Sequence, residues 1–141
     1  MNPAAPHIEV AAGLVFRGGK LLITQRPAES HLGGRWEFPG GKRENDETFE
    51  NCLRRELREE LGIDVVIHEL IESVTHEYAE KIVTLKFYRC SWKANEPRAL
   101  GCPAFCWVTP GELSNHEFPE ADVKLMELLQ RRTELWESEA G

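Results

Sequence analysis

The segment Gly41–Ile63 reads GKRENDETFENCLRRELREELGI, and its second half has the clearest helical pattern in the chain. Apolar side chains recur there at every fourth position: Phe49, Leu53, Leu57 and Leu61. The Thr48 hydroxyl is suited to accept a bond from a free N–H at a helix N-terminus, and Gly62 suits a helix C-terminus. The pattern therefore predicts a helix that begins after Thr48, ends before Gly62 and packs one face on a core.

Three acidic side chains share one face of this predicted helix. Glu56, Glu59 and Glu60 stand at i, i+3 and i+4, and at roughly 100° per residue they occupy one arc at the margin of the apolar stripe. Like charges at this spacing oppose helix formation unless a cation binds them, and oxygen ligands favour Mg²⁺ or Mn²⁺ over zinc. The alternative is an ordinary solvated face, with ion pairs to Arg54, Arg55 and Arg58.

The rest of the chain predicts a sheet on which helices pack. Four runs have the composition or alternation of strands: Ile8–Phe16, Leu21–Gln25, Val65–Thr75 and Ile82–Trp92. The first two form a hairpin, Phe105–Val108 is a shorter strand, and residues 27–43 read as a loop rich in Gly and Pro. Apolar residues between Val123 and Trp136 have a helical period. Interleaved strands and helices predict one α/β domain over residues 1–141 with a central mixed sheet.

The composition excludes several classes of protein. Of the 141 residues, 41% are apolar, and 17 Lys and Arg face 24 Asp and Glu, which gives a net charge of −7. A nucleic-acid scanner or a membrane-surface protein needs basic surface, so the acidic balance argues against both. No apolar run approaches the ~20 residues of a membrane span, and residues 1–6 lack the pattern of a signal peptide. We expect a cytoplasmic protein whose four cysteines are buried free thiols.

Residues Gly41–Ile63 resemble the Nudix box. Five residues separate Gly41 from Glu47, and seven more precede RELREELGI, which matches every defined position of that pattern. Other stretches look like the MutT-type branch of this family: Glu9–Gly13, Leu22–Arg26, Trp36–Lys42 and Phe118–Asp122. The resemblance implies an α/β/α sandwich around a mixed sheet. It also implies an enzyme that cleaves nucleoside triphosphates to the monophosphate and pyrophosphate.

The resemblance assigns roles within the box. It implies Mg²⁺, with Mn²⁺ as the alternative, bound by the carbonyl of Gly41 and the carboxylates of Glu56, Glu59 and Glu60. The catalytic set is Glu56 as the general base or a metal ligand, Glu59, and Arg55, which is expected to orient a glutamate of the box. Bound cations would also let an acidic protein hold a polyanionic substrate.

Four residues align with positions that hold the nucleotide in MutT relatives: Arg26, Phe38, Tyr78 and Asp122. Aromatic rings can stack on a base, and an ionised Asp122 accepts hydrogen bonds without donating them, which favours a guanine-type edge. Each residue also has a purely structural interpretation. Phe38 and Tyr78 fit a core, Arg26 fits a charged surface, and Asp122 fits a helix N-cap.

Two positions qualify this assignment. Gly101 aligns with the loop position at which MutT-like relatives often supply a further acidic ligand. Either Glu77 or Glu80 replaces that carboxylate, or water and substrate oxygens complete the metal shell, as Mg²⁺ commonly allows. Glu47 is expected to pair within the box rather than to bind the primary metal.

The expected activity is hydrolysis of an oxidised purine nucleotide such as 8-oxo-dGTP. Within the same class, CTP or another pyrimidine triphosphate and the 5′ end of RNA are alternative substrates, and the acidic surface disfavours RNA. A non-catalytic nucleotide-binding module is the alternative from a different class. The expected partners are a small nucleotide and at most an RNA 5′ end, with no membrane, and the expected assembly is a monomer or homodimer.

Overall fold

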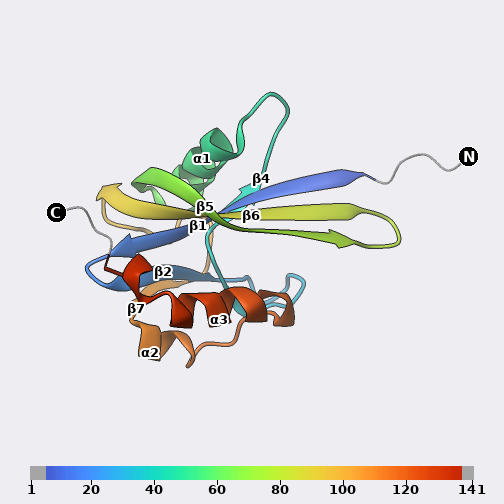
Figure 1. Ribbon diagram of the computed structural model, residues 1–141. Coiled ribbons are helices and arrows are strands. Elements are labelled where there is room, and N and C mark those ends of the chain that lie inside the picture. Colours follow the sequence, from blue (N-terminus) through green and yellow to red (C-terminus); the bar gives the residue numbers. More distant parts are fainter. Residues whose placement is uncertain (1–5, 138–141) are drawn as a thin grey trace, which may run out of the picture.

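The fold is described from a computed structural model, which describes residues 6–137 (Figure 1). The strands are β1 (His7–Arg17), β2 (Lys20–Gln25), β3 (Trp36–Glu37), β4 (Gly40–Lys42), β5 (Asp64–Glu77), β6 (Ile82–Ala94) and β7 (Phe105–Val108). The helices are α1 (Phe49–Leu61), α2 (Pro110–Leu113) and α3 (Val123–Arg131), with 3₁₀ turns η1 (Glu120–Asp122) and η2 (Thr133–Leu135).

These strands form one mixed sheet in the order β3-β2-β1-β6-β5, with β4 paired to β1 and β7 paired to β2. β1 runs parallel to β6 and antiparallel to β2 and β4. β4 pairs with β1 around Ala11, and β2 pairs with it only near Phe16. The predicted α/β class with a central mixed sheet is confirmed.

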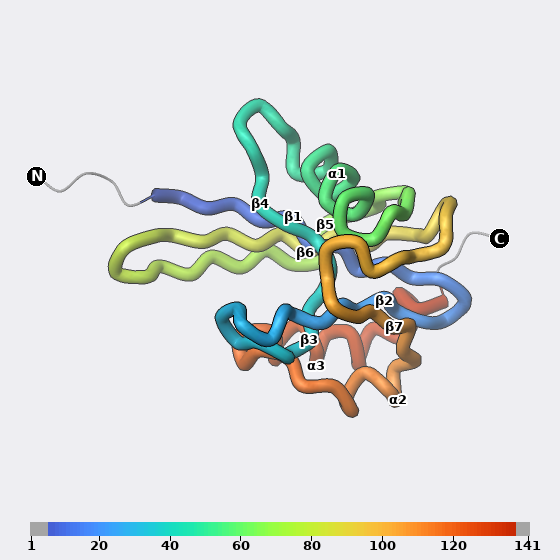
Figure 2. Tube along the Cα trace, turned by 180° about the vertical axis from the view of Figure 1, so that it is seen from behind, coloured from blue at the N-terminus to red at the C-terminus, as the bar shows by residue number. Residues whose placement is uncertain are grey.

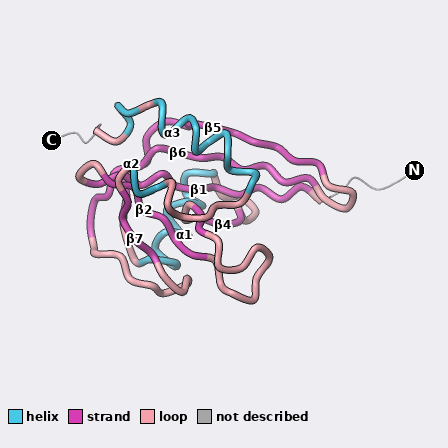
Figure 3. The backbone as a smooth tube through the Cα atoms, turned by 90° about the horizontal axis from the view of Figure 1, so that it is seen from below, coloured by secondary structure: helices cyan, strands magenta, loops and turns pink. Residues whose placement is uncertain are grey.

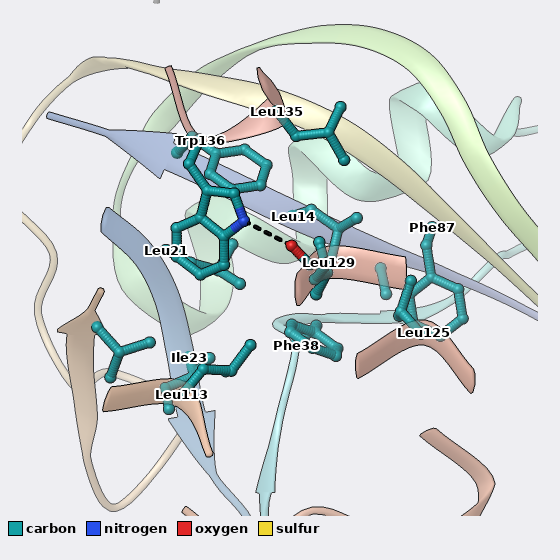
Figure 4. Packing of buried hydrophobic residues seen from close by; sticks show 13 residues of the cluster. Leu14, Leu21, Ile23, Phe38, Phe87, Leu113, Leu125, Leu129, Leu135 and Trp136 are labelled. Atoms are coloured by element: carbon teal, nitrogen blue, oxygen red, sulfur yellow. Dashed lines mark hydrogen bonds between the residues drawn. The ribbon is translucent and has the colours of Figure 1, made fainter. Parts of the chain in front are cut away.

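Helices cover both faces of the sheet, with α1 on one side and α3 on the other (Figures 1 and 3). Side chains of β1 alternate between the two layers, so Ala11 and Val15 belong to the core under α1, whereas Leu14 and Phe16 belong to the core under α3. In the second core, the Trp136 indole donates to a backbone carbonyl of α3 at 3.0 Å (Figure 4). Burial of these apolar side chains holds both helices against the sheet.

The helix α1 forms as its sequence predicts. Thr48 Oγ1 accepts from the Asn51 backbone N–H at 3.0 Å, and Gly62 ends the helix in the left-handed conformation at φ 71°. The face toward the sheet is fully buried at Leu53, Leu57 and Leu61. The hairpin of β1 and β2 is also confirmed, as are β5, β6 and β7, although β5 and β6 run one or two residues further than the alternation predicts.

Three local predictions are wrong in part, and one short helix is not predicted. Residues 27–43 contain β3 and β4, which are too short for any sequence period and exist because β2 and β1 offer pairing partners. The last helix ends at Arg131 rather than continuing to Trp136, because Arg132 leaves helical geometry at ψ 70°. The short helix α2, capped by Thr109, was not expected. All four cysteines are free thiols, but only Cys52 and Cys90 are fully buried.

Among the helices within residues 6–137, none is long and apolar enough to cross a membrane.

Candidate active site

The site is built around a close approach between β4 and α1. At Gly40, φ is 156° and a Cβ atom would overlap the carbonyl oxygen of Ala11, so only glycine lets β4 lie this near to β1. At Gly41, a Cβ atom would overlap the carboxylate of Glu56. The absence of a side chain at both positions therefore sets the carboxylate of α1 directly against the backbone of β4.

Arg55 organises the glutamates of this region. Its guanidinium donates twice to Glu47, from Nε at 2.7 Å and from Nη2 at 3.0 Å, and it also donates to the Lys42 carbonyl at 3.0 Å. Nη1 donates to Glu56 at 3.0 Å and to Glu59 at 3.4 Å. The hydrogen bonds from Arg55 lower the pKa of Glu47 to about 2, with help from the Glu44 backbone N–H. Glu47 thus pairs with Arg55, and Arg55 in turn holds two carboxylates of α1.

The three glutamates of α1 have different surroundings. Burial raises the pKa of Glu56, and its hydrogen bond from Arg55 opposes that rise. Glu59 is 62% exposed. Glu60 turns inward. Burial, then the charges of Glu37 and Glu56, raise the pKa of Glu60 to about 8, against the effect of the Thr24 hydroxyl beside it.

Glu60 Oε1 is buried and has no hydrogen-bond partner among the described residues. Such an atom is costly to leave unsatisfied, and a carboxylate oxygen is a preferred ligand for a hard divalent cation. The donor set of a backbone carbonyl and carboxylates therefore fits Mg²⁺ or Mn²⁺ in its chemistry. Within residues 6–137, however, no three His, Cys, Asp or Glu side chains converge as a metal-binding cluster, since Glu59 faces solvent while Glu60 faces the interior.

Gly101 lies against the C-terminal end of α1. Its N–H and that of Leu100 donate to the Glu60 carbonyl at 3.0 and 3.1 Å, and a Cβ at Gly101 would lie 3.3 Å from Glu60 Cα. The hairpin that carries Glu77 and Glu80 extends away from that end of α1 in two opposite views (Figures 1 and 2). The carboxylate whose charge acts on Glu60 from outside α1 is instead that of Glu37.

A cleft of about 860 Å³ opens on the face of the sheet that α3 partly covers. All four residues aligned with nucleotide-binding positions line it: Arg26, Phe38, Tyr78 and Asp122. Gly40 and Gly41 line the same cleft. Gly40 and Gly41, here called the glycine corner, therefore contact Glu56 through Gly41 and also line the cleft that holds the predicted nucleotide-binding residues.

One end of this cleft is charged. Arg26 donates to Glu37 at 2.7 Å and to the His31 carbonyl at 2.8 Å. Burial and then the charge of Glu37 raise the pKa of Asp122 to about 6, while Arg26 opposes the rise. Asp122 stands at the N-cap position of α3, but its side chain makes no capping hydrogen bond. Its carboxyl is therefore not used by the helix, and Glu37 joins the site as a residue that the sequence analysis did not single out.

The two aromatic residues of the cleft differ in exposure. Phe38 is buried, meets Phe87 edge to face at 6.1 Å between centroids and lies 5.1 Å from Phe118, so it is a core residue whose edge reaches the cleft. Tyr78 is 52% exposed, and the Lys81 ammonium lies 5.7 Å from its ring. The core interpretation therefore holds for Phe38 and fails for Tyr78, which leaves the Tyr78 ring accessible to a ligand.

Known proteins resemble this chain along most of its length. A sequence model of the NUDIX domain matches residues 11–128. The CTP pyrophosphohydrolase of Escherichia coli (strain K12) is 39% identical over 120 residues, which cover 85% of this chain and 89% of that protein. The 8-oxo-dGTP diphosphatase of Proteus vulgaris is 46% identical over 88 residues, which cover 61% of this chain and 79% of that protein. The crystal structure of the MutT protein from Methanosarcina mazei Go1 aligns with a TM-score of 0.78 and 25% identity, over 92% of this chain and 97% of that one.

These similarities agree with the local features. The matched span contains the whole segment Gly41–Ile63, together with the glycine corner and the glutamates of α1. It also contains β1 from Ala11 onward, the other strands of the sheet and two thirds of α3. The chain therefore belongs to the Nudix family, and it is a MutT-like hydrolase.

Proposed function

We propose that this protein is a divalent-metal-dependent nucleoside triphosphate pyrophosphohydrolase that converts an oxidised purine nucleotide such as 8-oxo-dGTP to its monophosphate and pyrophosphate. The observation that carries this proposal is the cleft itself, which joins the Arg26 and Asp122 end to the Gly41 corner against Glu56. A nucleotide has the same division, with a base to recognise at one end and phosphates to cleave at the other.

The base is assigned to the end of the cleft that holds Asp122. With a pKa of about 6, its carboxyl is mostly ionised above neutral pH and accepts hydrogen bonds from N–H groups of a guanine-type edge. The Arg26 guanidinium, fixed by Glu37, supplies donors beside it. Tyr78 presents an accessible ring for stacking, and the edge of Phe38 closes the apolar wall.

The phosphates are assigned to the α1 end, where Gly41, Glu56, Glu59 and Glu60 would hold Mg²⁺, with Mn²⁺ as the alternative. When bound, the metal neutralises phosphate charge and lowers the pKa of the attacking water. Hydrolysis forms a bond from the water oxygen to phosphorus, breaks the P–O bond to pyrophosphate and releases a proton. We assign that proton to Glu56, whose pKa is raised by burial against the opposing effect of the Arg55 hydrogen bond.

The test is pyrophosphate release over a panel of 8-oxo-dGTP, dGTP, CTP, dCTP and triphosphorylated RNA, with Mg²⁺ or Mn²⁺. Wild type is compared with Glu59→Gln and with Glu50→Gln, a control that removes an exposed charge from the first turn of the same helix. We expect metal-dependent turnover with the highest kcat/KM on 8-oxo-dGTP. Glu59→Gln should lower kcat/KM by at least about 100-fold, since even groups that only orient metal ligands contribute 10–100-fold.

Other outcomes would redirect the proposal. The similarity to the CTP pyrophosphohydrolase of Escherichia coli favours a preference for CTP. That result would assign a pyrimidine substrate to the same reaction. A preference for triphosphorylated RNA would do the same for the RNA 5′ end. Absence of metal-dependent turnover on every substrate would reject the enzyme and favour a nucleotide-binding module.

The setting of this activity is also a proposal. A free nucleotide substrate is consistent with a cytoplasmic protein, and the family match over residues 11–128 supports one domain spanning 1–141. The proposed assembly is a monomer or a homodimer.

A further inference from the structure

The segment between β4 and α1 is fastened to β1 by one arginine. Arg43 Nε donates to Glu9 Oε1 at 2.9 Å, Nη2 donates to the same oxygen, and the Arg43 backbone N–H donates to the Glu9 carbonyl at 2.7 Å. The remaining terminal nitrogen, Nη1, donates to the backbone carbonyl of Glu47 at 2.7 Å. A single guanidinium thus joins the sheet to the residue whose carboxylate binds Arg55.

The chain of contacts continues to the glutamates of α1. Glu47 accepts two hydrogen bonds from Arg55, at 2.7 and 3.0 Å, and its side chain is only 19% exposed. Arg55 then reaches Glu56 at 3.0 Å and Glu59 at 3.4 Å. Glu9 is therefore connected to the carboxylates of Glu56 and Glu59 by direct hydrogen bonds, without bridging water.

The guanidinium of Arg43 is itself held in place. It lies 5.5 Å from the Phe49 ring, and Lys86 Nζ lies 4.2 Å from that same ring. The side chains of Arg43 and Glu9 are 29% and 26% exposed, so this ion pair is half-buried rather than a surface contact. Arginine suits the position because its planar fork can bind a carboxylate and a carbonyl at once, whereas lysine presents a point charge.

We propose that Arg43 and Glu9 are positioning residues for hydrolysis: they fix Glu47 so that Arg55 holds Glu56 and Glu59 where the divalent cation binds. This inference rests on the proposed metal-dependent function. Neither residue lines the cleft or belongs to the proposed metal ligands. They act through the backbone at Glu47, which sits between the sheet and the N-terminus of α1.

The sign of the effect separates positioning from simple electrostatics. Arg43→Met removes a positive charge near a cation site. If only electrostatics mattered, the loss of this repulsion would make Mn²⁺ bind more tightly. Loss of positioning would make Mn²⁺ bind more weakly. Arg43→Lys keeps the charge but cannot bridge Glu9 and the Glu47 carbonyl together, so it should follow Arg43→Met if geometry matters.

The experiment measures Mn²⁺ binding to the full chain without nucleotide, by electron paramagnetic resonance of the free ion. The variants are Arg43→Met, Arg43→Lys and Glu9→Gln. The matched control is Arg17→Met. It removes a second arginine that is paired with a glutamate: Arg17 lies on β1, donates to both oxygens of Glu96 at 2.9 and 3.1 Å and lies 3.7 Å from the Trp92 ring. Thermal unfolding of each variant verifies that it folds.

We expect both Arg43 variants to raise the Kd for Mn²⁺ by about 5–10-fold, at or just below the lower end of the 10–100-fold measured for groups that orient metal ligands. Glu9→Gln should give a smaller rise, and Arg17→Met should match wild type even if its Tm falls. In turnover, the Arg43 variants should need more Mn²⁺ for half-maximal rate while KM for the nucleotide stays unchanged.

Three results would overturn the inference. The first is tighter or unchanged Mn²⁺ binding in folded Arg43→Met, the second is wild-type behaviour of Arg43→Lys, and the third is an equal loss in Arg17→Met. If wild type itself neither binds Mn²⁺ nor releases pyrophosphate, the proposed function fails and this inference fails with it. If wild type does both and only the Arg43 variants behave normally, the positioning role alone is rejected.

Discussion

The proposed site has two ends, which are constructed in different ways. The α1 end consists of Gly41, which lines the cleft, and the glutamates of α1 behind it, and the base end consists of the cleft residues proposed to bind the base. At the α1 end, Arg43 and Arg55 connect four carboxylates through direct hydrogen bonds, and all but Glu9 belong to the segment Gly41–Ile63. At the base end, Arg26, Phe38, Tyr78 and Asp122 arrive from four separate parts of the chain, and Tyr78 stands half in solvent. The α1 end is therefore pre-organised by a network of charged hydrogen bonds. The base end is more open to solvent and has one ion pair, between Arg26 and Glu37.

This difference in rigidity suggests that the α1 end governs the rate of hydrolysis and the base end governs recognition of the nucleotide. Groups that must be in place before the reaction gain most from a rigid network, because they need no reorganisation when charge develops. An open wall can instead accept bases of different shape. We expect substitutions at the α1 end to lower kcat and substitutions at the base end to raise KM.

The largest expected effect is that of Glu56→Gln. The amide keeps the shape beside Gly41 but can neither accept a proton from water nor carry the charge of a metal ligand. We expect kcat to fall by about 10²–10⁴-fold, the range for loss of a general base, with little change in KM for the nucleotide. Steady-state kinetics of pyrophosphate release at saturating Mg²⁺ measures both constants.

The control for this prediction is Glu50→Gln on the exposed side of the first turn of α1. It should leave both constants close to wild type. A tenfold rise in KM with normal kcat in Glu56→Gln would contradict the division between the two ends, because it would place Glu56 in binding alone.

The same division explains how much of the molecule could be predicted from its sequence. The helix α1 follows from spacing within 15 residues, and its caps at Thr48 and Gly62 are local as well. At Gly101 the sequence left two alternatives, a replacement carboxylate from Glu77 or Glu80, or water and substrate oxygens in the metal shell. It missed Glu37, whose charge acts on Glu60.

Glu37 was missed for a physical reason. It lies on β3, a strand of two residues that exists only because it pairs with β2, and its ion pair with Arg26 spans that same ladder. No periodicity can reveal a strand this short. The inward orientation of Glu60 depends in the same way on the packing of α1 against the sheet, which helical spacing alone does not define.

A smaller effect is expected at the base end from Tyr78→Ala. Base–aromatic stacking contributes ~1–3 kcal/mol, and the half-exposed ring should lie at the lower end, so KM should rise about 5–10-fold with kcat unchanged. Tyr78→Phe keeps the ring and should restore the wild-type KM. A loss of kcat in Tyr78→Ala, with KM unchanged, would show that the two ends are coupled.

The smallest effect is a pH-dependent change in stability from Asp122→Asn. Burial, with the Glu37 charge, raises the pKa of Asp122 from 3.8 to about 6. Between these two values the unfolded chain releases the proton while the folded protein keeps it. The free energy of unfolding then falls as pH rises through this window, and the loss stays constant above it.

Asparagine removes that loss because it has no proton to release. The Tm of Asp122→Asn minus that of wild type should therefore be near its minimum at pH 4, increase toward pH 6 and remain constant to pH 7.5, when both proteins are measured without metal or nucleotide. Glu120→Gln removes an exposed charge from the same 3₁₀ turn and controls for net charge. If the difference in Tm were the same at every pH, Asp122 would titrate alike in both states, and partial burial beside Glu37 would not raise its pKa.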